Sequence, residues 1–146
     1  MNNDDVLKLE NQLCFPLYAC SRQVIKLYKP YLDTLGITYT QYLTLLALWE
    51  KDQVTVKHLG DVLYLDSGTL TPLLKKMESM AILRRIRSTE DERSVLIELT
   101  SKGHAMKMDA YDIPKQVASK LKLSHEDAKE LHRILHLLLL QEGTGC

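Results

Sequence analysis

Apolar side chains recur at helical spacing over the first quarter of the chain. The residues that carry this pattern are Leu13, Leu17, Val24, Tyr28, Tyr31 and Leu35. They predict a long first helix that ends before Gly36. Pro16 sets the start of its regular part near residues 13–15, because proline is tolerated in the first turn of a helix but costs about 3 kcal/mol in its interior.

Three shorter helices are predicted next, each behind a residue whose side chain can cap it. They are a helix through Tyr42, Leu45, Leu46 and Trp49 behind Thr38 or Thr40, a helix over residues 56–63 behind Thr55, and a helix to about residue 80 behind Asp66 or Ser67. Pro72 falls early in the third of these helices, so its first turn is expected to be irregular.

The pattern then changes to the period of a strand. Residues 82–87 and 95–99 alternate apolar and polar side chains, with the charged turn STEDERS between them. This predicts a β-hairpin. A fifth helix is expected from Thr100 to about residue 121, kinked at Pro114. The spacing from Ser124 to Asp127 is that of a capping box, which opens a last helix ending near residue 141.

The expected fold is therefore mainly α with a small β-hairpin. Two short helices followed by a charged hairpin make a winged helix-turn-helix, which we assign to about residues 38–100. The outer helices carry apolar faces that this unit cannot cover, most clearly at Leu131, Ile134, Leu135 and Leu138. We therefore treat residues 1–146 as one domain in which about 1–35 and 101–146 are dimerisation helices, and expect a two-fold dimer that binds a pseudo-palindromic operator.

Composition excludes several classes of protein. The chain has 146 residues, of which 45% are hydrophobic, and no apolar stretch is long enough to cross a membrane. The polar and acidic N-terminus lacks the layout of a signal peptide, so a cytoplasmic location is expected. Three cysteines without a CxxC pair indicate neither a disulfide framework nor a structural zinc site, and no cofactor is expected.

The distribution of charge favours DNA binding although the net charge is zero. Residues 67–89 contain five basic side chains and one acidic side chain, and such a local excess can face phosphates. The second helix of the motif would enter the major groove. The residues predicted to contact DNA there are Ser67, Thr69, Thr71, Pro72, Lys75 and Lys76. A capped surface helix with solvated lysines is the competing interpretation, and Arg84 and Arg87 on the hairpin favour DNA.

The segment DERSVLIELT, residues 91–100, resembles the wing signature of the multiple-antibiotic-resistance regulators (MarR family). The matching residues are Asp91, Arg93, Leu99 and Thr100. The resemblance implies that Arg93, held by Asp91, enters a minor groove. A narrow minor groove has an enhanced negative potential that attracts arginine. A surface ion pair in a turn is the alternative.

The N-terminal segment resembles a narrower group of regulators within this family. LENQLCFPLYACSR, together with Tyr28, Tyr39 and LYLDSGTLTPLLKKME, resembles the organic-hydroperoxide-resistance regulators over nearly the whole chain. The resemblance implies a dimeric repressor that senses an organic hydroperoxide by oxidation of Cys14 and then releases its operator. It also implies that Tyr28 and Tyr39 of the partner subunit contact this cysteine.

The residues around Cys14 agree with such a role. Pro16 puts Cys14 near a helix N-terminus, which favours an anion, and Tyr18 lies one turn along on the same face. The neighbours Leu13, Phe15 and Leu17 suit an organic peroxide.

A sulfenic acid formed on Cys14 must next meet a thiol. Cys20 lies on another helical face. We therefore expect a small cellular thiol to react, with the terminal Cys146 as a candidate resolving cysteine.

Other functions are open at this point. His125, His132 and His136 lie near one face of the last helix, so a zinc-responsive regulator is an alternative. A regulator responding to a small phenolic ligand, bound among the tyrosines, and a global redox-responsive regulator are others. A thiol peroxidase using Cys14 would need an activating arginine or histidine near the thiol, which the sequence does not show. We therefore expect no enzyme.

Overall fold

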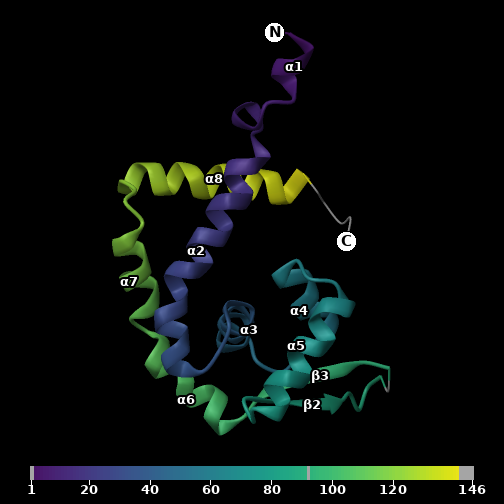
Figure 1. The fold of residues 1–146 in the computed structure, drawn as a ribbon. Helices are drawn as coiled ribbons and strands as arrows, with labels where there is room; N and C mark the ends of the chain where they lie inside the picture. Colours follow the sequence, from purple (N-terminus) through teal and green to yellow (C-terminus); the bar gives the residue numbers. More distant parts are fainter. Residues whose placement is uncertain (1, 92, 142–146) are drawn as a thin grey trace. The chain divides into compact units, whose positions relative to one another are not determined.

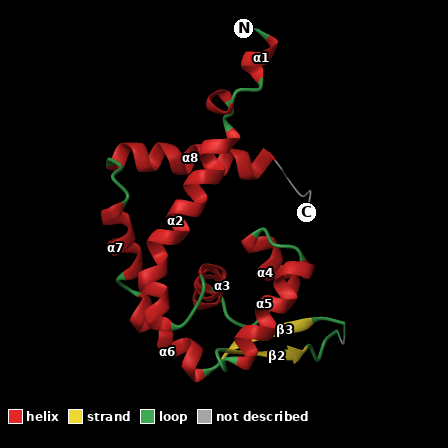
Figure 2. Ribbon diagram, in the orientation of Figure 1, coloured by secondary structure: helices red, strands yellow, loops and turns green. Residues whose placement is uncertain are grey.

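The computed structural model describes residues 2–91 and 93–141. Contacts divide the chain into two compact units, Met1–Tyr39 and Thr40–Cys146. Helices make up most of the described chain, and strands form one small sheet (Figures 1 and 2). The elements are α1 (Asn3–Val6), a 3-10 helix (Leu9–Asn11), α2 (Cys14–Leu35), α3 (Tyr39–Glu50), β1 (Val54–Thr55), α4 (Val56–Leu63), α5 (Ser67–Ser79), β2 (Leu83–Arg87), β3 (Val95–Leu99), α6 (Ser101–Ala110), α7 (Ile113–Lys120) and α8 (His125–Gln141).

The long helix α2 dominates the first unit. It begins at Cys14 and ends at Leu35, and Gly36 follows it in the left-handed conformation with φ 69°, so both predicted ends are confirmed. The sequence did not predict α1 or the 3-10 helix before it. These short turns are held by side chains: Gln12 Nε2 donates to the carbonyl oxygens of Val6 and Lys8 at 2.8 and 2.7 Å.

The helix-turn-helix consists of α4 and α5, and both predicted caps form. Thr55 Oγ1 accepts a hydrogen bond from the His58 amide at 3.0 Å, and Asp66 Oδ1 accepts one from the Thr69 amide at 2.7 Å. The irregular first turn expected from Pro72 is wrong, because α5 is continuous from Ser67 to Ser79. The cap and three buried side chains of α5, Leu70, Leu74 and Met77, offset the hydrogen bond that proline cannot make.

The wing is the predicted antiparallel hairpin of β2 and β3, in the register Leu83↔Leu99 to Arg87↔Val95. A third strand, β1, was not predicted. It pairs with the other edge of β3, so the sheet order is β1-β3-β2. Because β1 directly precedes α4, this pairing connects the wing to the first helix of the DNA-reading motif.

The C-terminal helices differ from the prediction at one place. Instead of one helix kinked at Pro114, the chain forms α6 and α7, separated at Tyr111 and Asp112. Pro114 lies in the first turn of α7, where a missing amide hydrogen costs nothing, so the proline starts a helix rather than bending one. The start of α8 is as predicted, with the Asp127 amide donating to Ser124 Oγ at 3.0 Å.

A small contact fixes the base of the wing to α6. Thr100 Oγ1 accepts from the Gly103 amide at 3.1 Å and donates to the Ile82 carbonyl oxygen at 2.9 Å. Trp49 Nε1 donates to the Gly103 carbonyl oxygen at 2.9 Å. A Cβ atom on Gly103 would collide with the Ile82 carbonyl oxygen, so only glycine lets α6 approach β2 this closely.

Candidate DNA interface and thiol site

Helix α5 separates its side chains into a buried face and an exposed face. Ser67, Thr69, Pro72, Lys75 and Lys76 are exposed and Thr71 is half-buried, as an element that enters a groove requires. The hydrogen bond from the Thr69 amide lowers the pKa of the Asp66 carboxyl, which keeps this cap ionised. The cap thus holds the start of α5 in place.

The turn between α4 and α5 is equally tight. The Leu65 amide donates to the Gly60 carbonyl oxygen at 3.0 Å, and a Cβ atom on Gly60 would lie 2.9 Å from the Leu65 carbonyl oxygen. Tyr64 ends α4 with φ 57°, an unusual conformation for a residue with a side chain. This geometry sets the angle at which α5 leaves α4.

The basic side chains of the wing do not have equal surroundings. Arg84 lies opposite Glu98 in the sheet and forms an ion pair with it at 3.0 Å, so part of its charge is already balanced. Arg87 is exposed at the end of β2. The Arg85 amide donates to Glu78 Oε2 at 2.9 Å, which ties the wing to α5. The wing and α5 therefore form one surface.

Asp91 organises the wing tip through the backbone. Its Oδ1 atom accepts from the Arg93 amide at 3.0 Å, and its Oδ2 atom accepts from Ser94 Oγ at 3.3 Å. Ser88 Oγ accepts from the Glu90 and Asp91 amides at 3.2 and 3.4 Å. Arg93 itself is exposed. Asp91 thus fixes the main chain of Arg93, a mode of holding that the sequence pattern did not specify, and the bond uses no guanidinium donor.

Substitutions in α5 should separate contacts with bases from contacts with phosphates. We expect Lys75→Ala to weaken binding to operator and to random DNA alike, and to lower the slope of log affinity against log salt by about one. Thr71→Ala should weaken operator binding more than random binding. Titrations at several salt concentrations measure both effects. Lys129→Ala on α8 removes the same charge elsewhere, and an equal effect of this control would show that α5 is not the element in the groove.

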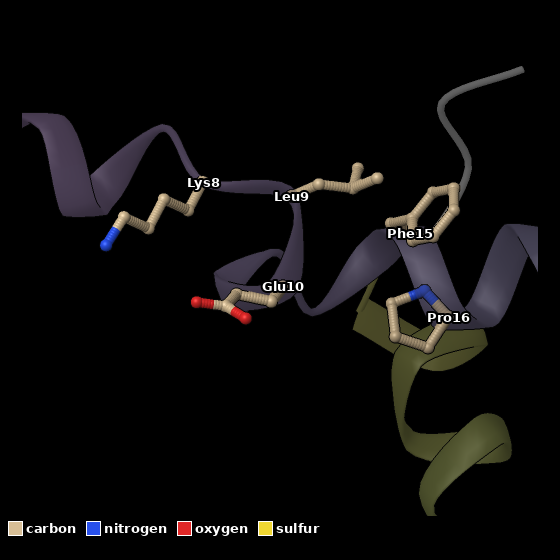
Figure 3. A pocket seen from close by; sticks show the side chains of 5 residues that line it. All are labelled: Lys8, Leu9, Glu10, Phe15 and Pro16. Carbon is tan, nitrogen blue, oxygen red and sulfur yellow. The ribbon is translucent and has the colours of Figure 1, made fainter.

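Cys14 is the first residue of α2, and its thiol is free and exposed. The amide groups of a first helical turn have no partner inside the helix and favour an anion beside them. The adjacent apolar side chains are also exposed, Leu13 by 87% and Phe15 by 43%. A surface pocket of about 600 Å³ is lined by Lys8, Leu9 and Glu10 and by the two residues that follow Cys14 in the chain, Phe15 and Pro16, with the Leu9 side chain extending toward Phe15 (Figure 3).

Tyr18 does not stand alone one turn beyond the thiol. Arg22 Nη1 donates to its hydroxyl oxygen at 3.5 Å, and the Arg22 guanidinium carbon lies 5.6 Å from the centre of the ring. This pairing was not predicted from the sequence, although the i, i+4 spacing of the two residues indicates it. Arg22 thereby brings a positive charge to the side chain expected to face Cys14.

Tyr28 and Tyr39 meet within the first unit. Their ring centroids are 4.9 Å apart at an interplanar angle of 55°. Partial burial raises the pKa of both phenols, and Tyr28 raises the pKa of Tyr39 further. Both hydroxyl groups therefore remain protonated at neutral pH.

The tyrosine pair lies far from the thiol of its own chain. Fourteen residues of α2 separate Cys14 from Tyr28, which corresponds to about 21 Å along a helix axis. A site that contains the thiol and both phenols therefore needs two chains. Cys20 is a second exposed free thiol on α2. Cys146, the candidate resolving cysteine, lies outside the described residues.

The described residues contain no group of three or more histidine, cysteine or acidic side chains able to hold a metal ion. His132 and His136 form a close pair on α8, and His125 lies two turns earlier on the same helix.

None of the helices within residues 2–91 and 93–141 has the length and apolar character that crossing a membrane requires.

Comparisons with known proteins agree with this geometry. Residues 26–110 match the family model of the transcriptional regulators SarA/Rot. The organic hydroperoxide resistance transcriptional regulator of Bacillus subtilis is 57% identical over 138 residues, 94% of each chain. The regulator SarZ of Staphylococcus saprophyticus is 42% identical over 87% of each chain. Reduced AbfR bound to DNA superimposes with a TM-score of 0.77 at 34% identity, covering 96% of this chain and 98% of AbfR.

These matches cover the helix-turn-helix, the wing and the segment around Cys14 together, so they include every element of the candidate interface. The chain is a transcriptional regulator and not an enzyme. Its winged helix-turn-helix fold is confirmed by two solved structures bound to DNA, that of AbfR and that of a MarR mutant from E. coli. The chain belongs to the MarR family of transcriptional regulators, in the branch of the organic-hydroperoxide-resistance regulators.

Proposed function

We propose that this regulator is a dimeric cytoplasmic repressor that releases its pseudo-palindromic operator when an organic hydroperoxide oxidises Cys14. The observation that carries the proposal is the position of Cys14, an exposed thiol at the first residue of α2, followed in the chain by Phe15 and Pro16, which line a surface pocket with Leu9, Lys8 and Glu10. The Leu9, Phe15 and Pro16 side chains can accept the alkyl part of the peroxide.

The chemistry needs two steps. The Cys14 thiolate attacks one peroxide oxygen, the O–O bond breaks, and the other oxygen leaves as an alcohol after taking up a proton. The cysteine is thereby oxidised to a sulfenic acid. A small cellular thiol then attacks the sulfur, water leaves, and a mixed disulfide forms. AbfR, which has been solved both reduced on DNA and in a disulfide form, supports redox control in this fold.

The tyrosine pair supports a site shared between two chains. Tyrosine is protonated at neutral pH, and burial raises the pKa of Tyr28 and Tyr39 further, so both phenols can donate a hydrogen bond to the partner subunit's thiolate or sulfenate. The exposed apolar side chains at the start of α2 and along α8 supply surface for such a dimer. Operator reading by two wings then depends on the spacing that the dimer sets.

Release follows from a misfit in this shared site. A bulky adduct on Cys14 cannot occupy the space that a thiol occupies beside two aromatic rings, so the helices must shift. A hundredfold loss of operator affinity corresponds to about 3 kcal/mol. Overpacking of an ordered interface typically costs 1–3 kcal/mol, so one such change in each half of a dimer is sufficient.

Mass spectrometry and operator binding measured on the same sample test the proposal. After one equivalent of cumene hydroperoxide and a small thiol, we expect the mass of one thiol adduct per chain at Cys14, in proportion to the fraction of DNA released. Hydrogen peroxide at the same concentration should give less of both. If DNA is released without modification of Cys14, or if Cys14 is fully modified and DNA stays bound, the proposed switch is wrong.

A further inference from the structure

Two imidazole rings lie together on α8. His132 and His136 are four residues apart, so their side chains are about 40° from each other around the helix axis. Their ring centroids are 4.0 Å apart, and the ring planes are inclined by only 30°. Both residues are exposed to solvent. The two rings are nearly stacked, so one ring must rotate about its χ2 angle before both can direct a nitrogen lone pair at one ion, and the exposure of both side chains leaves room for that rotation.

The hydrogen bonding of His136 prepares it as a ligand. Its Nδ1 atom lies 2.8 Å from the His132 carbonyl oxygen. A carbonyl oxygen only accepts, so Nδ1 carries the hydrogen and the neutral ring has its lone pair on Nε2. Histidines that bind metals almost always donate their other ring N–H in this way, often to a backbone carbonyl oxygen. The bond orients the ring and fixes the tautomer that a metal requires.

We propose that His132 and His136 form a binding site for a divalent first-row transition-metal ion, one per chain, with Nε2 of each ring as a ligand and water at the other positions. Imidazole suits zinc, copper and nickel ions and is poorly suited to magnesium or calcium. The nearby cation Arg133 is ion-paired with Glu130, which limits its repulsion of a metal ion.

The position of the pair on α8 leaves it open when the helix packs against another surface. Viewed down the axis of α8, His132 and His136 point in one direction, and Leu131 and Leu138 point in another. The two directions differ by roughly 130°. The exposed side chains of Leu131, Ile134 and Leu138 form the face available for packing, whereas Leu139 and Leu140 lie on either side of the two histidines. An ion bound by His132 and His136 would join two successive turns of the helix without entering that face.

Calorimetric titration of Ni²⁺ into the reduced, untagged dimer tests the site. We expect one Ni²⁺ per chain in the natural sequence. The single substitutions His132→Gln and His136→Gln should each weaken binding by roughly a hundredfold, because each removes one of the two ligands. The variant that carries both substitutions should not bind at this site. His125→Gln removes a histidine from the same helix and should leave the affinity unchanged. Cys14→Ser should also bind normally, because the thiol takes no part.

A change of spacing provides the sharpest control. The double substitution His136→Leu with Leu137→His keeps the composition of α8 but turns the second imidazole away from the first, so binding should be lost while the helical content measured by circular dichroism stays the same. The proposal is overturned if the natural chain binds no Ni²⁺ at this site, if the variant with both histidines replaced binds as tightly as the natural chain, or if the spacing variant keeps its affinity.

Discussion

The Cys14→Ser variant is expected to bind operator DNA as tightly as the natural chain and to keep it when organic hydroperoxide and thiol are added. Serine retains a small hydrogen-bonding group at the first residue of α2 but cannot form a sulfenic acid, so it separates folding from sensing. The natural chain should lose about a hundredfold in affinity under the same conditions, or about 3 kcal/mol. A DNA titration with and without peroxide and thiol measures the difference.

The other two cysteines provide the controls. Cys20→Ser should respond normally, because six residues of helix turn this thiol about 120° away from Cys14. Cys146→Ser distinguishes the two chemical routes: it should release DNA normally in the presence of a small thiol if that thiol caps Cys14. If Cys14→Ser still releases the operator, the sensor lies elsewhere in the chain and the proposed mechanism fails.

Arg93→Ala is expected to cause the largest loss of DNA affinity among the wing substitutions. The Asp91 carboxylate holds the Arg93 backbone at the tip of the hairpin, so the exposed side chain can reach a minor groove from a fixed position. We expect a loss of about 1–3 kcal/mol, or roughly five- to 150-fold, at moderate salt. The far-UV spectrum and the dimer should not change, because the Arg93 side chain is exposed.

Two companion variants identify the cause of that loss. Asp91→Ala keeps the guanidinium but frees the backbone that carries it, so it should weaken binding by a smaller amount. Arg133→Ala removes an equal charge from α8 and should have little effect. Operator affinity that is unchanged in Arg93→Ala would exclude insertion by this residue, and the wing would then act through Arg84 or Arg87.

Elements with a local cause were predictable from the sequence. The caps at Thr55 and Asp66, the left-handed Gly36 and the alternation of the hairpin each depend on a few neighbouring residues, and the structure has all four. Strand β1 could not be found in this way. It is two residues long and exists because β3 offers an open edge for pairing, which depends on residues more than forty positions away.

Pro114 shows how a correct signal received the wrong interpretation. A proline disrupts a helix, and the sequence correctly places a disruption near residue 114. Tyr111 and Asp112, between the two helices, both keep right-handed helical backbone angles, so the interruption is only two residues long. Proline at position 114 cannot donate the hydrogen bond that a continuous helix would direct to the Ala110 carbonyl oxygen. The contact between Tyr18 and Arg22 could not be predicted for a different reason: the i, i+4 spacing permits it, but an exposed arginine has several rotamers and the sequence does not select one.

The length of α2 has a genetic consequence. Cys14 and Tyr28 stand on one helix but about 21 Å apart, so each proposed sensor combines the thiol of one subunit with the phenols of the other. An allele that lacks Cys14 and an allele that lacks both tyrosines are each inactive as sensors alone. In a cell that expresses both, mixed dimers contain one intact sensor, with the thiol from the second allele and the tyrosines from the first. Mixed dimers are therefore expected to release the operator on oxidation, whereas homodimers of either allele keep it, so the complementation is measured on purified mixed dimers.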